Sequence, residues 1–296
     1  MPAMAGTEAF QYETAFSSNL GLLSPEEQSR LRQATVALAG MGGVGGAHLL
    51  TLTRLGVGRF TIADGDVFEL SNLNRQTGAT LATLGRPKVE VMAEMARAIN
   101  PELAIRTFPH GIDDGNIRDF LSGADIVVDG IDFFEMATRR LLFRQARAQG
   151  LSVVTCGPLG FGVASLAFGP NGMSFDEFMA LDEGMDETEQ LLRFAVGLAP
   201  AGLHLPYLDR TRISVTKRRG PSSAIAIDLC AAVAATEVLC FLLKRRALPY
   251  APRYAHFDPY RQRYCTGTLW LGNRHPLQRV KRWVLKRRLR QQLATS

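Results

Sequence analysis

A glycine-rich segment constrains the fold of this chain more than any other feature. Residues 40–45 read Gly-Met-Gly-Gly-Val-Gly and directly follow an apolar, strand-like run at Thr35–Ala39. Glycine at these spacings permits a tight turn from a strand into a helix, and it lets backbone N–H groups at the helix N-terminus approach a phosphate. The pattern favours a Rossmann-type nucleotide site over a ligand-free turn. Its glycines are Gly40, Gly42, Gly43 and Gly45.

Asp64 adds a second element of the same site. It ends the next strand-like run, 59–63, and lies 19 residues after Gly45. A carboxylate at the end of the second strand of a Rossmann-type sheet can bind the hydroxyl groups of a ribose. The glycine loop and Asp64 together predict a nucleotide ligand without saying which one.

Short strand-like runs alternate with helical stretches up to about residue 170. Strands are expected at 35–39, 59–63, 103–108, 125–129 and 151–155, and helices at 24–33, 42–55, 87–99 and 135–148. This alternation is typical of an α/β fold with a doubly wound, Rossmann-like, mostly parallel sheet and helices on both faces. A smaller, mixed C-terminal part is expected to extend it, with strands at 160–168, 253–257 and 264–269 and a long apolar helix at 222–244.

The chain is accordingly divided into four segments. These are an N-terminal arm (1–23), a nucleotide-binding Rossmann-like part (24–170), a second part of the same domain (171–272) and a basic tail (273–296).

The net charge of +6 is unevenly distributed along the chain. Ten basic and no acidic residues follow Asp258, whereas residues 1–258 carry 24 basic and 28 acidic side chains, a net charge of −4. The body is therefore not a general nucleic-acid binder. The basic tail is a candidate contact surface for RNA, anionic lipid or an acidic partner, and a solvated, disordered tail is the alternative.

Composition also bears on the compartment. Met1–Phe16 has neither the basic start nor the apolar run of a signal peptide. The longest apolar stretch, Ile225–Leu243, contains Asp228 and Glu237, so it reads as a buried core helix and no transmembrane segment is expected. The four cysteines form no CxxC pair, which argues against zinc and against a disulfide framework. A cytoplasmic protein is expected.

The segment between Asp64 and Lys88 favours a triphosphate over a dinucleotide. The pyrophosphate of NAD is largely served by backbone amides, whereas ATP brings more charge to neutralise. Arg75 offers a planar fork for phosphate oxygens and Lys88 offers a point charge. Asp132, which follows the expected strand 125–129, can hold Mg²⁺ bridging phosphates or can cap the next helix.

At these residues the sequence resembles the ThiF/MoeB/HesA family, the adenylating domains related to ubiquitin-activating enzymes. The shared pattern consists of GxGGVG at 40–45, DxDxVxxSNLxRQ at 64–76, GxPK at 85–88, INP at 99–101 and the Asp at 132. The resemblance implies a homodimer that uses MgATP to adenylate a substrate carboxylate, giving an acyl-AMP and pyrophosphate. The carboxylate would belong to a ubiquitin-like protein C-terminus, a peptide or a modified tRNA, and residues 171–272 would carry the substrate and dimerisation surfaces.

The resemblance also assigns roles to individual residues. The four glycines would cradle the phosphates, Asp64 would bind the ribose, and Asp132 would hold Mg²⁺. Arg75 and Lys88 would act on the phosphates. The residues that complete the nucleotide site are Asp66, Asn72 and Gln76.

Three departures from the family pattern matter. No cysteine lies between Pro158 and Leu229, where thioester-forming members keep their nucleophile, so the chemistry is expected to proceed without a cysteine thioester. The position of the arginine that reaches a partner's ATP in dimers is occupied by Ser17-Ser18, and Phe133 replaces the usual Asn after Asp132. Two alternatives stay open: an NAD(P)-dependent oxidoreductase and a non-catalytic nucleotide-binding scaffold of the same fold.

Overall fold

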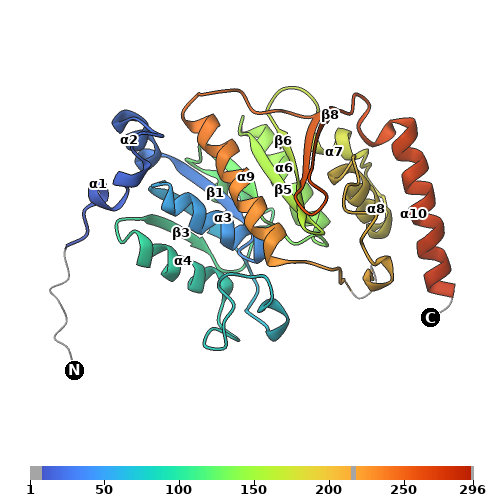
Figure 1. The fold of residues 1–296 in the computed structure, drawn as a ribbon, viewed down its shortest axis with the longest axis horizontal. Coiled ribbons are helices and arrows are strands. Elements are labelled where there is room, and N and C mark those ends of the chain that lie inside the picture. Colours follow the sequence, from blue (N-terminus) through green and yellow to red (C-terminus); the bar gives the residue numbers. More distant parts are fainter. Residues whose placement is uncertain (1–8, 215–217, 295–296) are drawn as a thin grey trace.

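The computed structural model describes residues 9–214 and 218–294, which form one eight-stranded sheet with helices on both faces (Figure 1). The strand order is β3-β2-β1-β4-β5-β6-β7-β8. The first five strands of this order are parallel, and β6, β7 and β8 continue the sheet in antiparallel fashion. The predicted doubly wound sheet with a mixed C-terminal extension is confirmed. The strands are β1 (Thr35–Ala39), β2 (Arg59–Ala63), β3 (Ala104–Phe108), β4 (Ile126–Asp129), β5 (Val153–Leu159), β6 (Gly162–Phe168), β7 (Arg253–Asp258) and β8 (Arg263–Thr268).

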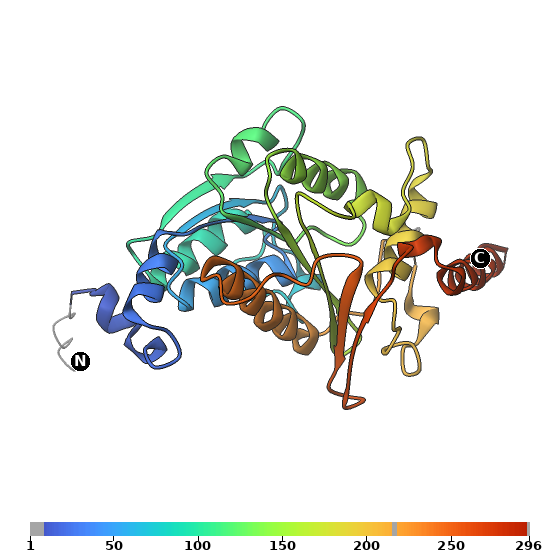
Figure 2. The same cartoon turned by 90° about the horizontal axis from the view of Figure 1, so that it is seen from above.

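Two hydrophobic cores lie on the two faces of the sheet, and Figure 2 shows the helices that enclose them. One core is closed by α3 (Gly43–Arg54), α4 (Lys88–Ile99) and α9 (Ala224–Leu242). The other is closed by α5 (Ile117–Leu121), α6 (Met136–Ala148), α7 (Phe175–Met179) and α8 (Glu187–Leu198). The remaining elements are α1 (Tyr12–Ala15), η1 (Ser17–Asn19), α2 (Pro25–Gln33), η2 (Leu70–Asn72), η3 (Arg210–Arg212), η4 (Gly272–Arg274) and α10 (Pro276–Ala294).

Local sequence signals set several helix ends where they were expected. At the start of α2, the Ser24 hydroxyl accepts the backbone N–H of Glu27 at 3.2 Å, and the Glu27 carboxylate accepts the N–H of Ser24 at 3.0 Å. This reciprocal capping box satisfies two of the free N–H groups at the helix N-terminus. A proline sets the C-terminus of α4. Asn100 has an extended backbone conformation because Pro101 follows it, and α4 ends at Ile99.

The long apolar helix α9 belongs to the core. It is the one helix among the described residues that is long and apolar enough to cross a membrane by length and composition. In the structure it packs on α3, β5 and β6 and buries Ala226, Cys230 and Ala234. This agrees with the predicted core helix.

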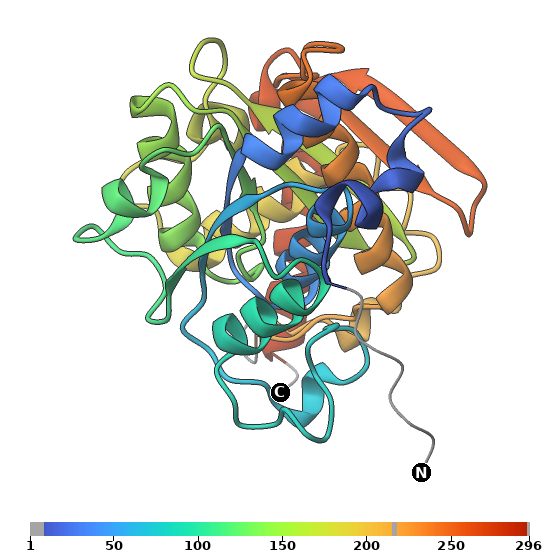
Figure 3. The ribbon, with the colours of Figure 1, turned by 90° about the vertical axis from the view of Figure 1, so that its left-hand side faces the viewer.

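The first and the last described helices lie far apart. Viewed from the N-terminal side, α1 and α2 face the viewer (Figure 3), whereas α10 lies at the opposite end of the molecule (Figure 1). The basic segment forms the helix α10 over 276–294, so the alternative of a disordered tail is wrong for these residues. The first eight residues of the arm and the last two of the tail lie outside the described residues, and the proposed segment boundaries stay a prediction.

Candidate functional site

The sheet register brings the predicted site residues to one edge. Ala39 at the end of β1 pairs with Ala63 of β2 on one side and with Asp129 of β4 on the other. The residues that follow these strands therefore meet at the carboxyl edge of the parallel sheet. The chain order reverses between β1 and β4, which is where open α/β sheets form a ligand crevice.

Two glycines of the loop are required by close packing. Gly40 has a φ of +91°, and a Cβ there would lie 2.3 Å from the carbonyl oxygen of Gly130. A Cβ on Gly45 would lie 1.7 Å from the carbonyl oxygen of Gly40. A side chain at Gly40 would force the glycine loop away from the turn after β4, and one at Gly45 would open the glycine loop itself. The loop and this turn thus form one packed unit.

The other two glycines leave the start of α3 open. Gly42 is the N-cap of α3 and has no side chain to cap it, so the first N–H groups of the helix stay available to an anion. A Cβ on Gly42 would approach the side-chain amide of Gln76 at 3.6 Å, and one on Gly43 would approach Ile227 of α9 at 2.9 Å. The helix N-terminus is therefore bordered by Gln76 on one side and by α9 on the other.

Asp64 holds the glycine loop in place. Its carboxylate accepts the backbone N–H of Met41 at 2.6 Å and that of Asp66 at 2.8 Å. The residue is 9% exposed, and burial raises the pKa of its carboxyl above the ordinary value, opposed by the nearby Lys88 charge and the two backbone donors. Each carboxylate oxygen keeps a second lone pair, so a ribose hydroxyl can still donate to it.

Lys88, in the first turn of α4, lies close to Asp64 and Asp66. Its ammonium group donates to Asp66 at 2.8 Å, and the lysine side chain is 8% exposed whereas that of Asp66 is 71% exposed. A buried cation paired with one solvated carboxylate retains attraction for further anions. Asp64, Asp66 and Lys88 thus lie together, and their roles toward a nucleotide stay a prediction.

A short turn positions Arg75 and Gln76. The Asn72 side chain accepts the N–H of Glu69 at 2.9 Å, and its backbone carbonyl accepts the N–H groups of Arg75 and Gln76 at 3.1 and 2.9 Å. Asn72 is 7% exposed, so it builds the turn from inside. Its role in the structure is to shape the loop that presents Arg75.

Arg75 keeps its charge available. Its guanidinium donates to the carbonyl of Ser71 at 2.8 Å and to the side-chain oxygen of Asn74 at 2.9 Å, both of which are neutral. Within the described part of the chain it forms no salt bridge. Gln76 is 8% exposed, and its Oε1 has no hydrogen-bond partner there. An unpaired buried amide beside the helix N-terminus fits a polar ligand that lies on the loop.

Asp132 lies on the turn between β4 and α6 and is exposed. Its carboxylate accepts the backbone N–H of Phe134 at 2.9 Å, so it stabilises the turn, although Glu135 is the residue that precedes α6. Within residues 9–214 and 218–294, no group of three or more His, Cys, Asp or Glu side chains is arranged to hold a metal ion. Asp132 therefore offers one carboxylate, and further ligands of a cation would have to come from phosphates or water.

The sequence reasoning missed the buried ion pair beneath this turn. Arg139 of α6 donates to Asp129 at 3.0 Å, and their side chains are 3% and 1% exposed. The same carboxylate accepts the Thr155 hydroxyl at 2.9 Å and the N–H of Ile131 at 3.1 Å. Arg139 also donates to the carbonyl of Ile131. No spacing rule would reveal the pair, since strand, turn and helix must first pack.

The C-terminal part reaches the same edge of the sheet. The Ser223 hydroxyl, at the start of α9, donates to the carbonyl of Gly160 at 3.0 Å, next to the end of β5. Tyr207 donates to Asp258 at 2.8 Å and accepts the N–H of Phe161 at 2.9 Å, while its ring stacks on that of Phe161. These residues were not predicted. They lie beyond the carboxyl end of β5, at the edge of the sheet that also carries the glycine loop.

The cysteines near the site are not reactive. Cys156 on β5 is 3% exposed, and burial raises the pKa of its thiol far above the ordinary value. Burial likewise raises the pKa of Cys230 on α9. The thiolate is the nucleophilic form of cysteine, so neither residue supplies a nucleophile at neutral pH.

The fold is that of the Rossmann-type nucleotide-binding proteins, and its glycine loop, Asp64, Arg75 and Lys88 lie at one edge of the sheet. The sequence profile of the ThiF family matches residues 16–280, and the chain belongs to this family. The family resemblance read from the motifs is thereby confirmed, over a longer stretch than the motifs cover.

Named relatives agree with this membership. The chain is 36% identical over 150 residues to the tRNA threonylcarbamoyladenosine dehydratase of Haemophilus influenzae, covering 50% of this chain and 57% of the relative. It is 37% identical over 112 residues to the sulfur carrier protein adenylyltransferase of Thermus thermophilus, covering 38% of this chain and 41% of the relative. The chain thus spans about half the length of the curated relatives it matches.

Solved structures show the same fold. An Escherichia coli MccB structure with ATP superposes with a TM-score of 0.63 at 18% identity, covering 83% of this chain and 66% of that one. The PaaA structure gives a TM-score of 0.64 at 18% identity, covering 91% and 76%. The E. coli TcdA structure gives 0.57 at 20% identity, covering 79% and 95%.

Proposed function

We propose that this protein binds MgATP at the glycine loop and adenylates a substrate carboxylate. The observation that carries the proposal is the set of cations around an uncapped helix N-terminus. Arg75 has no ionic partner among the described residues, and the largely buried Lys88 has a single solvated one. The named relatives include adenylyltransferases of sulfur carrier proteins, which supports the same reaction. An NAD(P)-dependent oxidoreductase has no comparable need for the two cations.

The proposed roles follow the geometry. Phosphates would lie on the N–H groups at the start of α3, bordered by the Gln76 amide. Asp64 would accept from the ribose while it fixes Met41 of the loop. Arg75 would give up its two neutral acceptors for phosphate oxygens, because charge-assisted hydrogen bonds are stronger.

The proposed reaction is a displacement at phosphorus. A substrate carboxylate oxygen attacks the α-phosphorus of ATP, the bond to the bridging oxygen breaks, and pyrophosphate leaves with the electron pair. Acyl-AMP and pyrophosphate are the products. The contribution of the protein is to align the reactants and to neutralise the charge that develops on the leaving group, which Arg75 and Lys88 would do.

We assign Mg²⁺ to Asp132, which is the finer part of the cofactor proposal. Its carboxylate is exposed on the turn after β4 and accepts one backbone N–H, so it retains oxygen lone pairs. One protein carboxylate together with phosphate oxygens and water is a common ligand set for this ion. When bound, the ion would offset part of the triphosphate charge.

We propose that the acyl group passes directly from the adenylate to its acceptor, with AMP as the leaving group, and without a cysteine thioester. Cys156 is buried, and burial raises its pKa. The substrate is proposed to be the carboxylate of a protein C-terminus, a peptide or a modified tRNA. We propose that it approaches past Phe161, Tyr207 and Ser223, which lie beyond the carboxyl end of β5. We further propose a cytoplasmic homodimer, in which a basic residue other than the missing arginine at Ser18 serves the phosphates.

Isothermal titration with ATP and Mg²⁺ tests the phosphate site. Arg75→Ala is expected to weaken binding by about 10–100-fold, since a charge-assisted hydrogen bond contributes about 1.5–3 kcal/mol. Lys88→Met is expected to do the same, and Arg75→Lys to lose less because it keeps the charge. Arg59→Gln is the matched control, because Arg59 is exposed at the amino end of β2, on the opposite edge of the sheet. Unchanged affinity in Arg75→Ala and Lys88→Met together would refute the site.

Thermal unfolding with different nucleotides tests the ligand class. A ligand that binds only the native state raises Tm. ATP with Mg²⁺ is expected to raise it, and NAD and NADP are not. Stabilisation by NAD but not by ATP would establish the oxidoreductase alternative. ATP binding without pyrophosphate exchange for any candidate carboxylate would favour the non-catalytic scaffold.

A further inference from the structure

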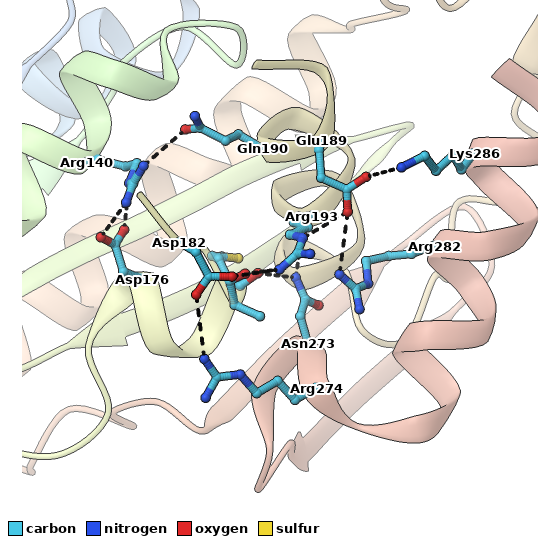
Figure 4. Close-up of polar contacts among 12 residues, drawn as sticks. Arg140, Asp176, Asp182, Glu189, Gln190, Arg193, Asn273, Arg274, Arg282 and Lys286 are labelled. Carbon is cyan, nitrogen blue, oxygen red and sulfur yellow. Dashed lines mark hydrogen bonds and ion pairs between the residues drawn. The ribbon is translucent and has the colours of Figure 1, made fainter. Parts of the chain in front are cut away.

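The C-terminal helix α10 turns several polar side chains toward the protein body, beside the half-buried Val284 and Leu285. Gln278, which faces the body of the protein, is 1% exposed. Lys286 donates to Glu189 of α8 at 2.8 Å, and Arg282 lies 3.8 Å from the same carboxylate. Figure 4 shows both cations directed from α10 toward Glu189. Helices on a protein surface usually do the opposite and bury their apolar side.

The attachment of α10 is specific rather than incidental. Asn273, just before the helix, is fully buried and donates to the carbonyls of Met179 and Arg193 at 3.0 and 2.6 Å (Figure 4). Lys281 donates to the carbonyl of Pro200 at 2.6 Å, which draws its charge toward the protein body. The orientation of the helix is therefore fixed by contacts along its length.

The outward side of α10 is apolar at its centre. Leu277, Val280 and Trp283 are 66%, 58% and 61% exposed. They are spaced three residues apart, so at about 3.6 residues per turn they follow one another along one face. The guanidinium of Arg287 lies over the Trp283 ring at 5.7 Å, and the exposed Arg279 borders the row.

The segment that precedes α10 also exposes large apolar side chains. Trp270 and Leu271 are 75% and 56% exposed, so both tryptophans of the chain are solvent-exposed in this region. No acidic residue occurs anywhere after Asp258. The surface thus combines exposed aromatic and aliphatic side chains with cations and carries no carboxylate of its own.

We propose that the outward side of α10 binds the surface of an anionic membrane, with Leu277, Val280 and Trp283 entering the interface. Interfacial helices combine such an apolar row with flanking arginine and lysine, and tryptophan favours the headgroup level. The charge is complementary to anionic headgroups. RNA fits less well, because Lys281, Arg282 and Lys286 are engaged with the protein body, and the apolar row forms no phosphate contacts.

Vesicle flotation of the full-length protein tests the proposal. The probes are phosphatidylcholine vesicles and vesicles of phosphatidylcholine with phosphatidylglycerol in a three-to-one ratio. The protein is expected to float with the second kind and not with the first. The double variant Val280→Ser with Trp283→Ser is expected to lower the vesicle–water partition coefficient by about tenfold or more. It removes two exposed apolar side chains that would enter the membrane interface.

Charge is tested separately. Arg279→Gln with Arg287→Gln is expected to weaken binding by about fivefold per arginine, whereas Arg54→Gln with Arg59→Gln, exposed elsewhere, should have no effect. Leu22→Ser is the control for the apolar variant, because Leu22 is 78% exposed on the N-terminal arm. All substituted residues are exposed, and an unchanged Tm with unchanged ATP affinity confirms that the fold and the nucleotide site are intact.

Several outcomes would overturn the proposal. Equal flotation with neutral vesicles, or no flotation at all, would do so. So would wild-type flotation of the Val280/Trp283 variant. If the same variant instead abolishes binding to single-stranded RNA or tRNA, or dissociates a dimer in sedimentation velocity, the surface serves that partner and not a membrane.

Discussion

Replacing Arg139 by Met is expected to damage both the fold and the nucleotide site. The guanidinium of Arg139 and the carboxylate of Asp129 form an ion pair at 3.0 Å, and both side chains are almost completely buried. The guanidinium also lies over the Phe194 ring at 4.4 Å. Met fills a similar volume in this buried position, so the variant removes the charge and the hydrogen bonds of the guanidinium without opening a large cavity.

The expected magnitude follows from the partners that remain. Without Arg139, the buried Asp129 carboxylate keeps two neutral donors, the Thr155 hydroxyl at 2.9 Å and the Ile131 N–H at 3.1 Å. An uncompensated buried charge costs about 3–5 kcal/mol of unfolding free energy. The turn between β4 and α6 also loses an anchor, since Arg139 donates to the carbonyl of Ile131. Because Gly130 in that turn packs on the glycine loop, ATP affinity is expected to fall as well.

Urea denaturation of wild type, Arg139→Met, Asp129→Asn and the double variant measures this. The double variant is expected to lose at least about 1 kcal/mol less than the sum of the single losses, because the second change removes the charge that the first left unpaired. Arg144→Met on the same helix is the control. Its side chain is 50% exposed and pairs with Asp176, so it should cost less than about 1 kcal/mol. Equal losses for Arg139→Met and Arg144→Met would refute the reasoning.

Three further predictions concern pH and the C-terminal helix. The hydrogen bond and charge of Arg245 lower the pKa of Glu27 to about 2, so the Tm advantage of wild type over Glu27→Gln should be present above about pH 4.5 and disappear as the pH falls toward 2. Burial lowers the pKa of His48 to about 3, and neither ring nitrogen has a hydrogen-bond partner among the described residues. Protonation of the unfolded chain should therefore reduce stability as the pH falls below about 6.5. His48→Leu should lose this pH dependence, and equal pH profiles of the variant and the wild type would contradict the prediction. Truncation after His275 keeps the buried Asn273, and ATP should still raise Tm by the same amount; loss of that response would place α10 in the nucleotide site.

Much of the Rossmann-like part, residues 24–170, could be predicted because the sequence signals for its helix and strand ends are local. Three such signals are the glycine spacing, the capping box at Ser24 and the helix end at Asn100-Pro101, each of which acts within a few residues. Most of the predicted strand and helix ends therefore lie within about two residues of those in the structure. The grouping of Asp64, Asp66 and Lys88 was implied by the motifs at 64–76 and 85–88 and by their resemblance to the ThiF/MoeB/HesA family, whereas the carboxyl-edge rule was applied to Asp132. The ligand and metal roles of these residues stay predictions.

What the sequence determined by itself is the class of fold, the glycine loop and the chain order of the site residues. What only the tertiary structure decided is which distant groups meet. Arg139 pairs with Asp129, Ile227 closes over Gly43, and Tyr207 reaches Asp258 only after the sheet and its helices have packed. The orientation of α10 is likewise decided by the tertiary structure. Its sequence offers both a polar and an apolar side, and the carboxylate of Glu189 on another helix selects the polar side for burial, because buried charges require partners and exposed apolar groups do not.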